Sequence, residues 1–192
     1  NDVINDINVI NVANPTSPVS VGGYNAGTIT SIYIAGRYAY VTDDSSDSLR
    51  IIDISNPAAP SSMASFSVGT SPDQVVVSGR YAYVVDDATD DLRIIDVSNP
   101  ASPSITATLS LGSLVFYSPG KPLFVSGRYA YVVDSNLDLL QVIDVGNPSS
   151  PSIITSLAIG TSPASLVVSG RYAYVVDNGS DDLKVIDITG IE

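Results

Sequence analysis

The sequence has no cysteine, histidine or tryptophan, and its only glutamate is the last residue, Glu192. Because cysteine is absent, the chain forms no disulfides and has no thiol nucleophile. Because histidine and internal glutamate are absent, it lacks the side chains that most often act as general acids and bases near neutral pH. The missing tryptophan removes the aromatic platform on which sugar-binding sites commonly rest. These absences speak against an enzyme.

The chain also has few positive charges and no long apolar run. Eight Lys and Arg residues stand against 20 acidic residues, which gives a net charge of −12. Nucleic acids and anionic lipid surfaces need clustered cations, so we expect neither to be a partner. No apolar stretch approaches the ~18 residues of a membrane-spanning helix, so we expect no membrane insertion. Cations and basic partners are compatible with this charge.

The residues that are present favour strands and turns. Val, Ile, Tyr and Thr are common in strands, and Asp, Ser, Asn, Gly and Pro are common in turns. The stretch Gly-Arg-Tyr-Ala-Tyr-Val occurs four times, beginning at Gly36, Gly79, Gly127 and Gly170. The intervals of 43, 48 and 43 residues are in the range of β-propeller blades. The sequence therefore predicts an all-β protein built from repeats.

Each repeat contains four expected strands, which in one copy are residues 74–77, 80–86, 92–97 and 104–111. The second and third strands are apolar on both faces, as strands covered on both sides are. Neighbouring blades cover one another in this way, although a solenoid of stacked hairpins is an alternative. We expect a β-propeller of about four four-stranded antiparallel blades of 43–48 residues, with an extra N-terminal strand.

The expected domain is a single propeller, residues 1–192, or part of a larger one. Its repeats are expected at about 1–30 (partial), 31–73, 74–121, 122–164 and 165–192 (partial).

The segments "GRYAYVVD", "LRIIDVSNP" and the following "ASP" resemble the LVIVD repeat family. The resemblance covers nearly the whole chain. It implies propeller-type repeats of the kind found in bacterial and archaeal proteins, many of them exported or surface-exposed. It also implies a scaffolding or binding role, and it transfers no catalytic residue to this chain.

The two ends of the sequence start and stop at the same point of the repeat. Residues 7–18 align with the third strand and its following turn, and residues 183–188 are again a third strand. A fourth strand near 19–21 could complete the last blade, which would leave one third strand too many. The surplus strand is displaced, pairs with another copy of the chain, or belongs to a longer propeller. We expect a protein partner or self-association through these terminal strands.

The two edges of the predicted ring differ in how variable their turns are. One edge carries near-constant Gly-Arg and Asn-Pro turns, whereas the links between fourth and first strands vary on the other edge. Variable loops on a constant scaffold commonly carry function. Our binding-face candidates are Phe116, Tyr117 and Lys121 in the longest link, and Tyr24 and Asn25 in another. Phe116 could instead simply pack its own loop.

Acidic turns between the second and third strands share the variable edge. Asp, Asn and Ser oxygens suit calcium, yet the Asp-x-Asp-x-Asp-Gly spacing of a calcium loop is missing. Asp is also common in tight turns because it accepts hydrogen bonds from nearby backbone N–H groups. We expect no cofactor unless these turns bind calcium. The candidate ligands are Asp43, Asp47, Asp86, Asp90, Asp134, Asp138, Asp177 and Asp181.

One Asp in each third strand sits among Ile and Val. These residues are Asp53, Asp96, Asp144 and Asp187. With a six-residue turn between the second and third strands, Asp96 should lie opposite Tyr81. A buried carboxylate needs hydrogen-bond donors, so we expect these four residues to be buried structural anchors that each accept at least two hydrogen bonds.

The function predicted from these features is a non-catalytic structural or protein-binding module of an exported or cell-surface protein. A calcium-dependent adhesive or carbohydrate-binding module is the alternative. An Asp-based hydrolase is a third reading, because glycosidases can work with paired carboxylates. We expect an extracellular or cell-surface location.

Overall fold

The computed structural model describes residues 6–112 and 122–190. Its described strands form five antiparallel sheets, three of them with four strands. We call these three sheets blades 1 to 3 and the following three-stranded sheet blade 4. A two-stranded pair, β1 (Asp6–Asn11) and β2 (Val19–Asn25), precedes them. The prediction of an all-β propeller with an extra N-terminal strand is confirmed.

The strands follow the chain in simple up-and-down order within each blade. Blade 1 consists of β3 (Ile29–Ala35), β4 (Tyr38–Asp43), β5 (Ser48–Asp53) and β6 (Ser61–Ser67), with the short 3₁₀ turn η1 (Asp44–Ser46) between β4 and β5. Blade 2 consists of β7 (Pro72–Ser78), β8 (Tyr81–Asp86), β9 (Asp91–Asp96) and β10 (Ser104–Ser110). Blade 3 consists of β11 (Leu123–Ser126), β12 (Tyr129–Asp134), β13 (Leu139–Asp144) and β14 (Ser152–Ala158). Blade 4 consists of β15 (Pro163–Ser169), β16 (Tyr172–Asp177) and β17 (Asp182–Asp187).

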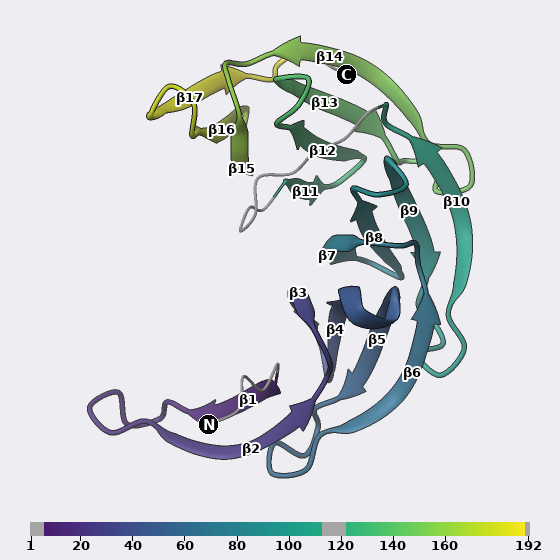
Figure 1. The fold of residues 1–192 in the computed structure, drawn as a ribbon, viewed down its shortest axis with the longest axis vertical. Coiled ribbons are helices and arrows are strands. Elements are labelled where there is room, and N and C mark those ends of the chain that lie inside the picture. Colours follow the sequence, from purple (N-terminus) through teal and green to yellow (C-terminus); the bar gives the residue numbers. More distant parts are fainter. Residues whose placement is uncertain (1–5, 113–121, 191–192) are drawn as a thin grey trace.

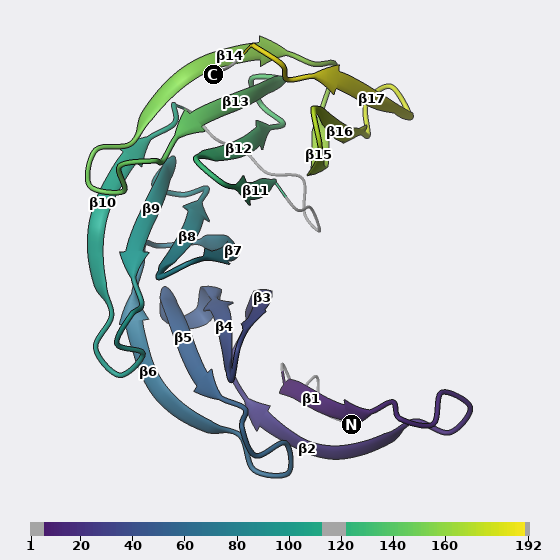
Figure 2. The same ribbon diagram turned by 180° about the vertical axis from the view of Figure 1, so that it is seen from behind.

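The blades stand side by side in an arc whose two ends do not meet (Figures 1 and 2). The first strands β3, β7, β11 and β15 lie on the inner side, and the fourth strands β6, β10 and β14 lie on the outer side. The pair β1–β2 is at one end and β17 is at the other. Strand β2 pairs with β1 and not with β17, so the described part of blade 4 has no fourth strand.

The core lies between neighbouring blades. Leu92 and Ile94 of blade 2 pack in one cluster with Leu123 and Ile143 of blade 3, and all four are fully buried or nearly so. Similar clusters join blades 1 and 2 and blades 3 and 4. The apolar residues on both faces of the middle strands in blades 1 to 3 are explained by this packing, because each of these blades has a neighbouring sheet on both sides.

Candidate functional site

A cavity of about 530 Å³ lies on the inner side of the arc. Its lining comes mainly from the first strands of the four blades, with Ser31, Gln74, Phe124 and Ser165 among the contributing residues. Two side chains hold these strands together across blades. Gln74 Oε1 accepts a hydrogen bond from the Leu123 N–H (2.8 Å), and Ser31 Oγ accepts one from the Val75 N–H (3.4 Å). The cavity therefore has walls of fixed geometry with both polar and apolar surface.

Asp73 lies on β7, one residue before the cavity-lining Gln74. Burial raises the pKa of Asp73 to about 6, and the neighbouring carboxylates of Asp87 and Asp44 add to the rise. Burial also raises the pKa of Asp87. A carboxyl group with a pKa near 6 can accept and return a proton at neutral pH. Asp73 is thus the described acidic residue best suited to acid–base chemistry beside the cavity.

The sequence interpretation missed Asp73. The signal was available, because Asp73 is the only charged residue in the four first strands that the structure describes. Its raised pKa could not be predicted from one repeat, since the neighbouring Asp44 belongs to blade 1 and Asp87 to blade 2.

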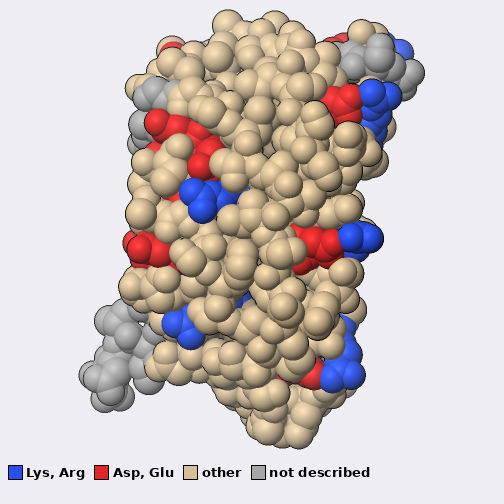
Figure 3. Space-filling view, turned by 90° about the vertical axis from the view of Figure 1, so that its right-hand side faces the viewer, with Lys and Arg blue, Asp and Glu red and all other residues tan. Residues whose placement is uncertain are grey.

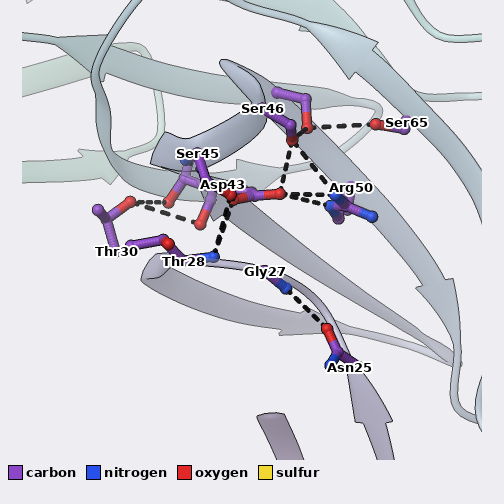
Figure 4. A network of polar contacts seen from close by, with 11 residues as sticks. Asn25, Gly27, Thr28, Thr30, Asp43, Ser45, Ser46, Arg50 and Ser65 are labelled. Carbon is purple, nitrogen blue, oxygen red and sulfur yellow. Dashed lines mark hydrogen bonds and ion pairs between the residues drawn. The ribbon is translucent and has the colours of Figure 1, made fainter. Parts of the chain in front are cut away.

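The first Asp of each acidic turn is buried, and in blades 1, 2 and 4 its hydrogen bonds join the turn to the link that precedes the blade. Asp43 Oδ1 accepts hydrogen bonds from the Thr28 N–H (3.0 Å) of the preceding link and from the Ser45 N–H (3.1 Å) of its own turn. Its Oδ2 faces Arg50 Nε at 2.8 Å (Figure 4). Burial alone would raise the pKa of Asp43, but hydrogen bonds from Ser46, Ser45 and Arg50 lower it to about 2. The equivalent residues Asp86, Asp134 and Asp177 are at most 1% exposed.

The other predicted metal ligands adopt the left-handed conformation that closes each turn. Asp47, Asp90, Asp138 and Asp181 have φ between 53° and 58°. The main-chain carbonyls of three of them accept hydrogen bonds from the following fourth-to-first-strand segment. Within residues 6–112 and 122–190, no group of three or more acidic side chains is placed to hold a metal ion. All eight candidates thus have structural roles in the turns, and calcium binding there remains a prediction.

The Asp residues at the ends of the third strands pair with the arginines of the Gly-Arg turns, on the edge of the arc that does not carry the acidic turns. Asp53, Asp96, Asp144 and Asp187 each accept hydrogen bonds from an Arg side chain and from a backbone N–H two residues later. Tyr81 lies opposite Asp96. Repeated blue and red pairs along one edge are visible in Figure 3. The Asp187 side chain is 41% exposed, so the expectation of a buried anchor is wrong there, because no blade in the described part of the chain covers that face of β17.

The remaining binding-face candidates have different positions. Tyr24 is partly buried against the cluster of Ala26, Ala39 and Ile52, so its ring packs into the fold. Asn25 is exposed, and its Oδ1 accepts a hydrogen bond from the Gly27 N–H (3.3 Å; Figure 4). Phe116, Tyr117 and Lys121 lie outside the described residues.

A model of the LVIVD repeat matches residues 26–68, 69–109, 121–158 and 162–189. No functionally curated protein matches the chain. Among solved structures, a candidate 6-phosphogluconolactonase from Bacteroides uniformis ATCC 8492 has a TM-score of 0.80 and 14% identity. The match covers 95% of this chain and 60% of the chain of that protein. The periplasmic gluconolactonase PpgL of Pseudomonas aeruginosa has a TM-score of 0.78 and 18% identity, with 97% and 61% covered. The β-propeller domain of Cps50 (Swd1) from Myceliophteria thermophila has a TM-score of 0.74 and 13% identity, with 95% and 63% covered.

These neighbours correct the predicted function. We expected a non-catalytic module and no enzyme, with a calcium-dependent adhesive or carbohydrate-binding module as the alternative and an Asp-based hydrolase as the third reading. The fold is instead one that a periplasmic gluconolactonase also has, so the expectation of a non-catalytic module is withdrawn. The chain spans about 60% of the length of the first structures that it matches.

No described helix is long and apolar enough to cross a membrane.

Proposed function

Because the chain belongs to the LVIVD repeat family and shares its propeller fold with gluconolactonases, we propose that its inner cavity hydrolyses a small polar ester, of which a sugar lactone is the representative. The observation that carries this proposal is Asp73, whose pKa of about 6 suits a general base at neutral pH. Asp73 directly precedes Gln74, which lines the cavity that would hold the substrate, although Asp73 is not itself among the lining residues. Fold similarity alone would not be sufficient, because one fold serves many functions.

Lactone hydrolysis needs a base, and Asp73 takes that role. The Asp73 carboxylate takes a proton from water while the water oxygen forms a bond to the lactone carbonyl carbon. The ring C–O bond then breaks, and the leaving alkoxide takes the proton from Asp73. The product is a hydroxy acid, and Asp73 returns to the carboxylate. Asp44 and Asp87 contribute by raising the pKa of Asp73, since nearby negative charge opposes its ionisation.

The charges of the chain favour a neutral substrate over a phosphorylated one. All seven Lys and Arg residues in the described part of the chain form ion pairs with Asp side chains. Recognition of a phosphate group generally requires cationic side chains that are available to it. The net charge of −12 adds long-range repulsion of an anionic substrate.

The location that fits this activity is outside the cytoplasm. The LVIVD repeats and the periplasmic gluconolactonase neighbour are compatible with an exported protein. We propose the cell surface or the extracellular space as the place of action, where small polar esters would reach the cavity without crossing the membrane.

We also propose that a second copy of the chain pairs with the ends of the arc. In the described sheets, β1 pairs only with β2, and β17 pairs only with β16. Ile10 and Leu183 at these ends are 53% and 59% exposed. Unpaired apolar edge strands readily recruit another strand. The apolar edges therefore favour a partner of the same β-repeat type, and this chain itself supplies one.

The activity is tested by following acid release from glucono-1,5-lactone and from its 6-phosphate, with the spontaneous rate of each subtracted. We expect the intact protein to accelerate hydrolysis of the neutral lactone more than that of the phosphate ester. Hydrolysis of the neutral lactone at the spontaneous rate would overturn the proposal.

A further inference from the structure

Blade 3 differs from the other blades at one position of its third strand, beside the acidic turn. The third position of the third strand is Arg50 in blade 1, Arg93 in blade 2 and Lys184 in blade 4. In blade 3 the same position is the uncharged Gln141. The buried Asp at the end of the second strand is nevertheless kept in all four blades, as Asp134 in blade 3. The exchange therefore removes a positive charge and leaves the negative charge in place.

The exchange leaves two buried oxygen atoms without donors. Asp134 is fully buried, and Gln141 is 3% exposed. Asp134 Oδ1 accepts hydrogen bonds from the Asn136 N–H (2.8 Å) and the Leu137 N–H (3.1 Å), but Oδ2 has no hydrogen-bond partner in the described structure. Gln141 Nε2 donates to the Leu111 carbonyl (2.8 Å), and within the same described residues Oε1 has no partner.

In blades 1, 2 and 4 this second carboxylate oxygen has a partner. In blade 2, Asp86 Oδ2 accepts hydrogen bonds from the Thr70 and Ser71 N–H groups, while Arg93 pairs with Asp91. In blade 1 the partner is a cation. There Arg50 Nε lies 2.8 Å from Asp43 Oδ2, and the guanidinium neutralises the buried carboxylate (Figure 4). In blade 4 the Lys184 ammonium lies 4.0 Å from Asp177 Oδ2. An unpaired buried carboxylate is costly, and so is a buried acceptor without a donor. Both costs arise together in blade 3.

We propose that blade 3 binds a monovalent metal cation of the size of sodium or potassium, between Asp134 Oδ2 and Gln141 Oε1. The ion takes the place of the Arg50 guanidinium, and carboxylate and amide oxygens are ligands that hard cations prefer. The Leu111 carbonyl adjoins the site through its hydrogen bond with Gln141 and has a second lone pair. A single carboxylate balances one positive charge, so a monovalent ion fits better than calcium.

The proposal is tested by thermal unfolding of the intact protein at pH 7.5 and constant ionic strength. Sodium or potassium chloride is exchanged stepwise for tetramethylammonium chloride, whose cation is too large for the site. We expect a saturable rise in Tm of at least about 2 °C with the small cations. An equal Tm in all three salts would overturn the proposal. A larger rise with millimolar calcium chloride would overturn the choice of a monovalent ion.

Two variants remove the need for the ion in different ways. Gln141→Arg restores the residue type of blade 1, and Asp134→Asn supplies an N–H donor in place of the charge. Each should unfold at the same temperature in sodium and tetramethylammonium chloride. Thr108→Arg, on the exposed outer strand β10, adds the same charge elsewhere and should keep the sodium response. Persistence of the sodium response in both site variants would contradict this site.

Discussion

The carboxylate of Asp86 lies where a side chain on Gly69 would have to be. Gly69 has φ of 130°, and a Cβ built on it would overlap Asp86 Oδ2. The bare backbone lets the next N–H groups reach the carboxylate, and the Thr70 N–H donates to it at 2.8 Å. This contact connects the link between blades 1 and 2 to the acidic turn of blade 2.

Gly69→Ala should therefore be much more destabilising than Gly79→Ala. Gly79 also has positive φ, at 60°, but a Cβ there would have no neighbour within 4 Å. We expect Gly79→Ala to cost about 1 kcal/mol from backbone strain alone, and Gly69→Ala to cost roughly 3 kcal/mol or more. Urea unfolding of both variants measures the difference. Equal losses would contradict the close approach of Gly69 to Asp86.

Asp43 should make stability sensitive to acid. Its folded pKa of about 2 lies below its ordinary value of 3.8, because hydrogen bonds from Ser46, Ser45 and Arg50 outweigh the effect of burial. The contribution of Asp43 is therefore complete above pH 3.8 and is lost as the pH falls towards 2. Urea unfolding between pH 5 and 2 should show a steeper loss for the wild type than for Asp43→Asn. Parallel curves would show that Asp43 gains nothing from its partners.

The repeat made most of the fold predictable. The third strand expected at 92–97 is β9, Asp91–Asp96, and Asp96 lies opposite Tyr81 as the turn length required. Local turn chemistry and apolar patterning were sufficient for that. The surroundings of two acidic residues, Asp134 and Asp73, could not be predicted in this way. The burial of Asp134 and the pKa of Asp73 depend on contacts between neighbouring loops and blades, which the pattern of one repeat does not contain.

Self-association is expected from the open ends of the arc. Light scattering after size-exclusion chromatography should give at least twice the mass of one chain, because β1 and β17 each have an unpaired edge in the described sheets. Val185→Lys, at an exposed position of β17, should weaken the association, whereas Ser156→Lys on the outer strand β14 should not. A strictly monomeric particle, with the amides of both β1 and β17 protected from hydrogen exchange, would contradict this expectation.

The ionised Asp73, on which the proposed activity depends, should lower the stability of the folded protein. Its folded pKa of about 6 exceeds its ordinary value of 3.8, so the folded state binds its proton more tightly than the unfolded state does. Stability therefore falls as the pH rises from about 4 to 6, and the cost persists above 6. Asp73→Asn removes this cost and should stabilise the protein by about 1–3 kcal/mol at pH 7.5. If urea unfolding showed that Asp73→Asn is less stable than the wild type, burial of the ionised carboxylate would not be a cost to the folded state.

The most direct test of the proposed hydrolase is the rate of glucono-1,5-lactone hydrolysis by Asp73→Asn beside the wild type. Asp47→Asn is the matched control, since it makes the same exchange in a left-handed turn position away from the cavity. We expect Asp73→Asn to lower the rate at pH 7 by about 100-fold or more, as loss of a general base does. The wild-type rate should rise with pH through about 6, the pKa of Asp73, and Asp47→Asn should follow the same profile. An undiminished rate in Asp73→Asn would contradict the account.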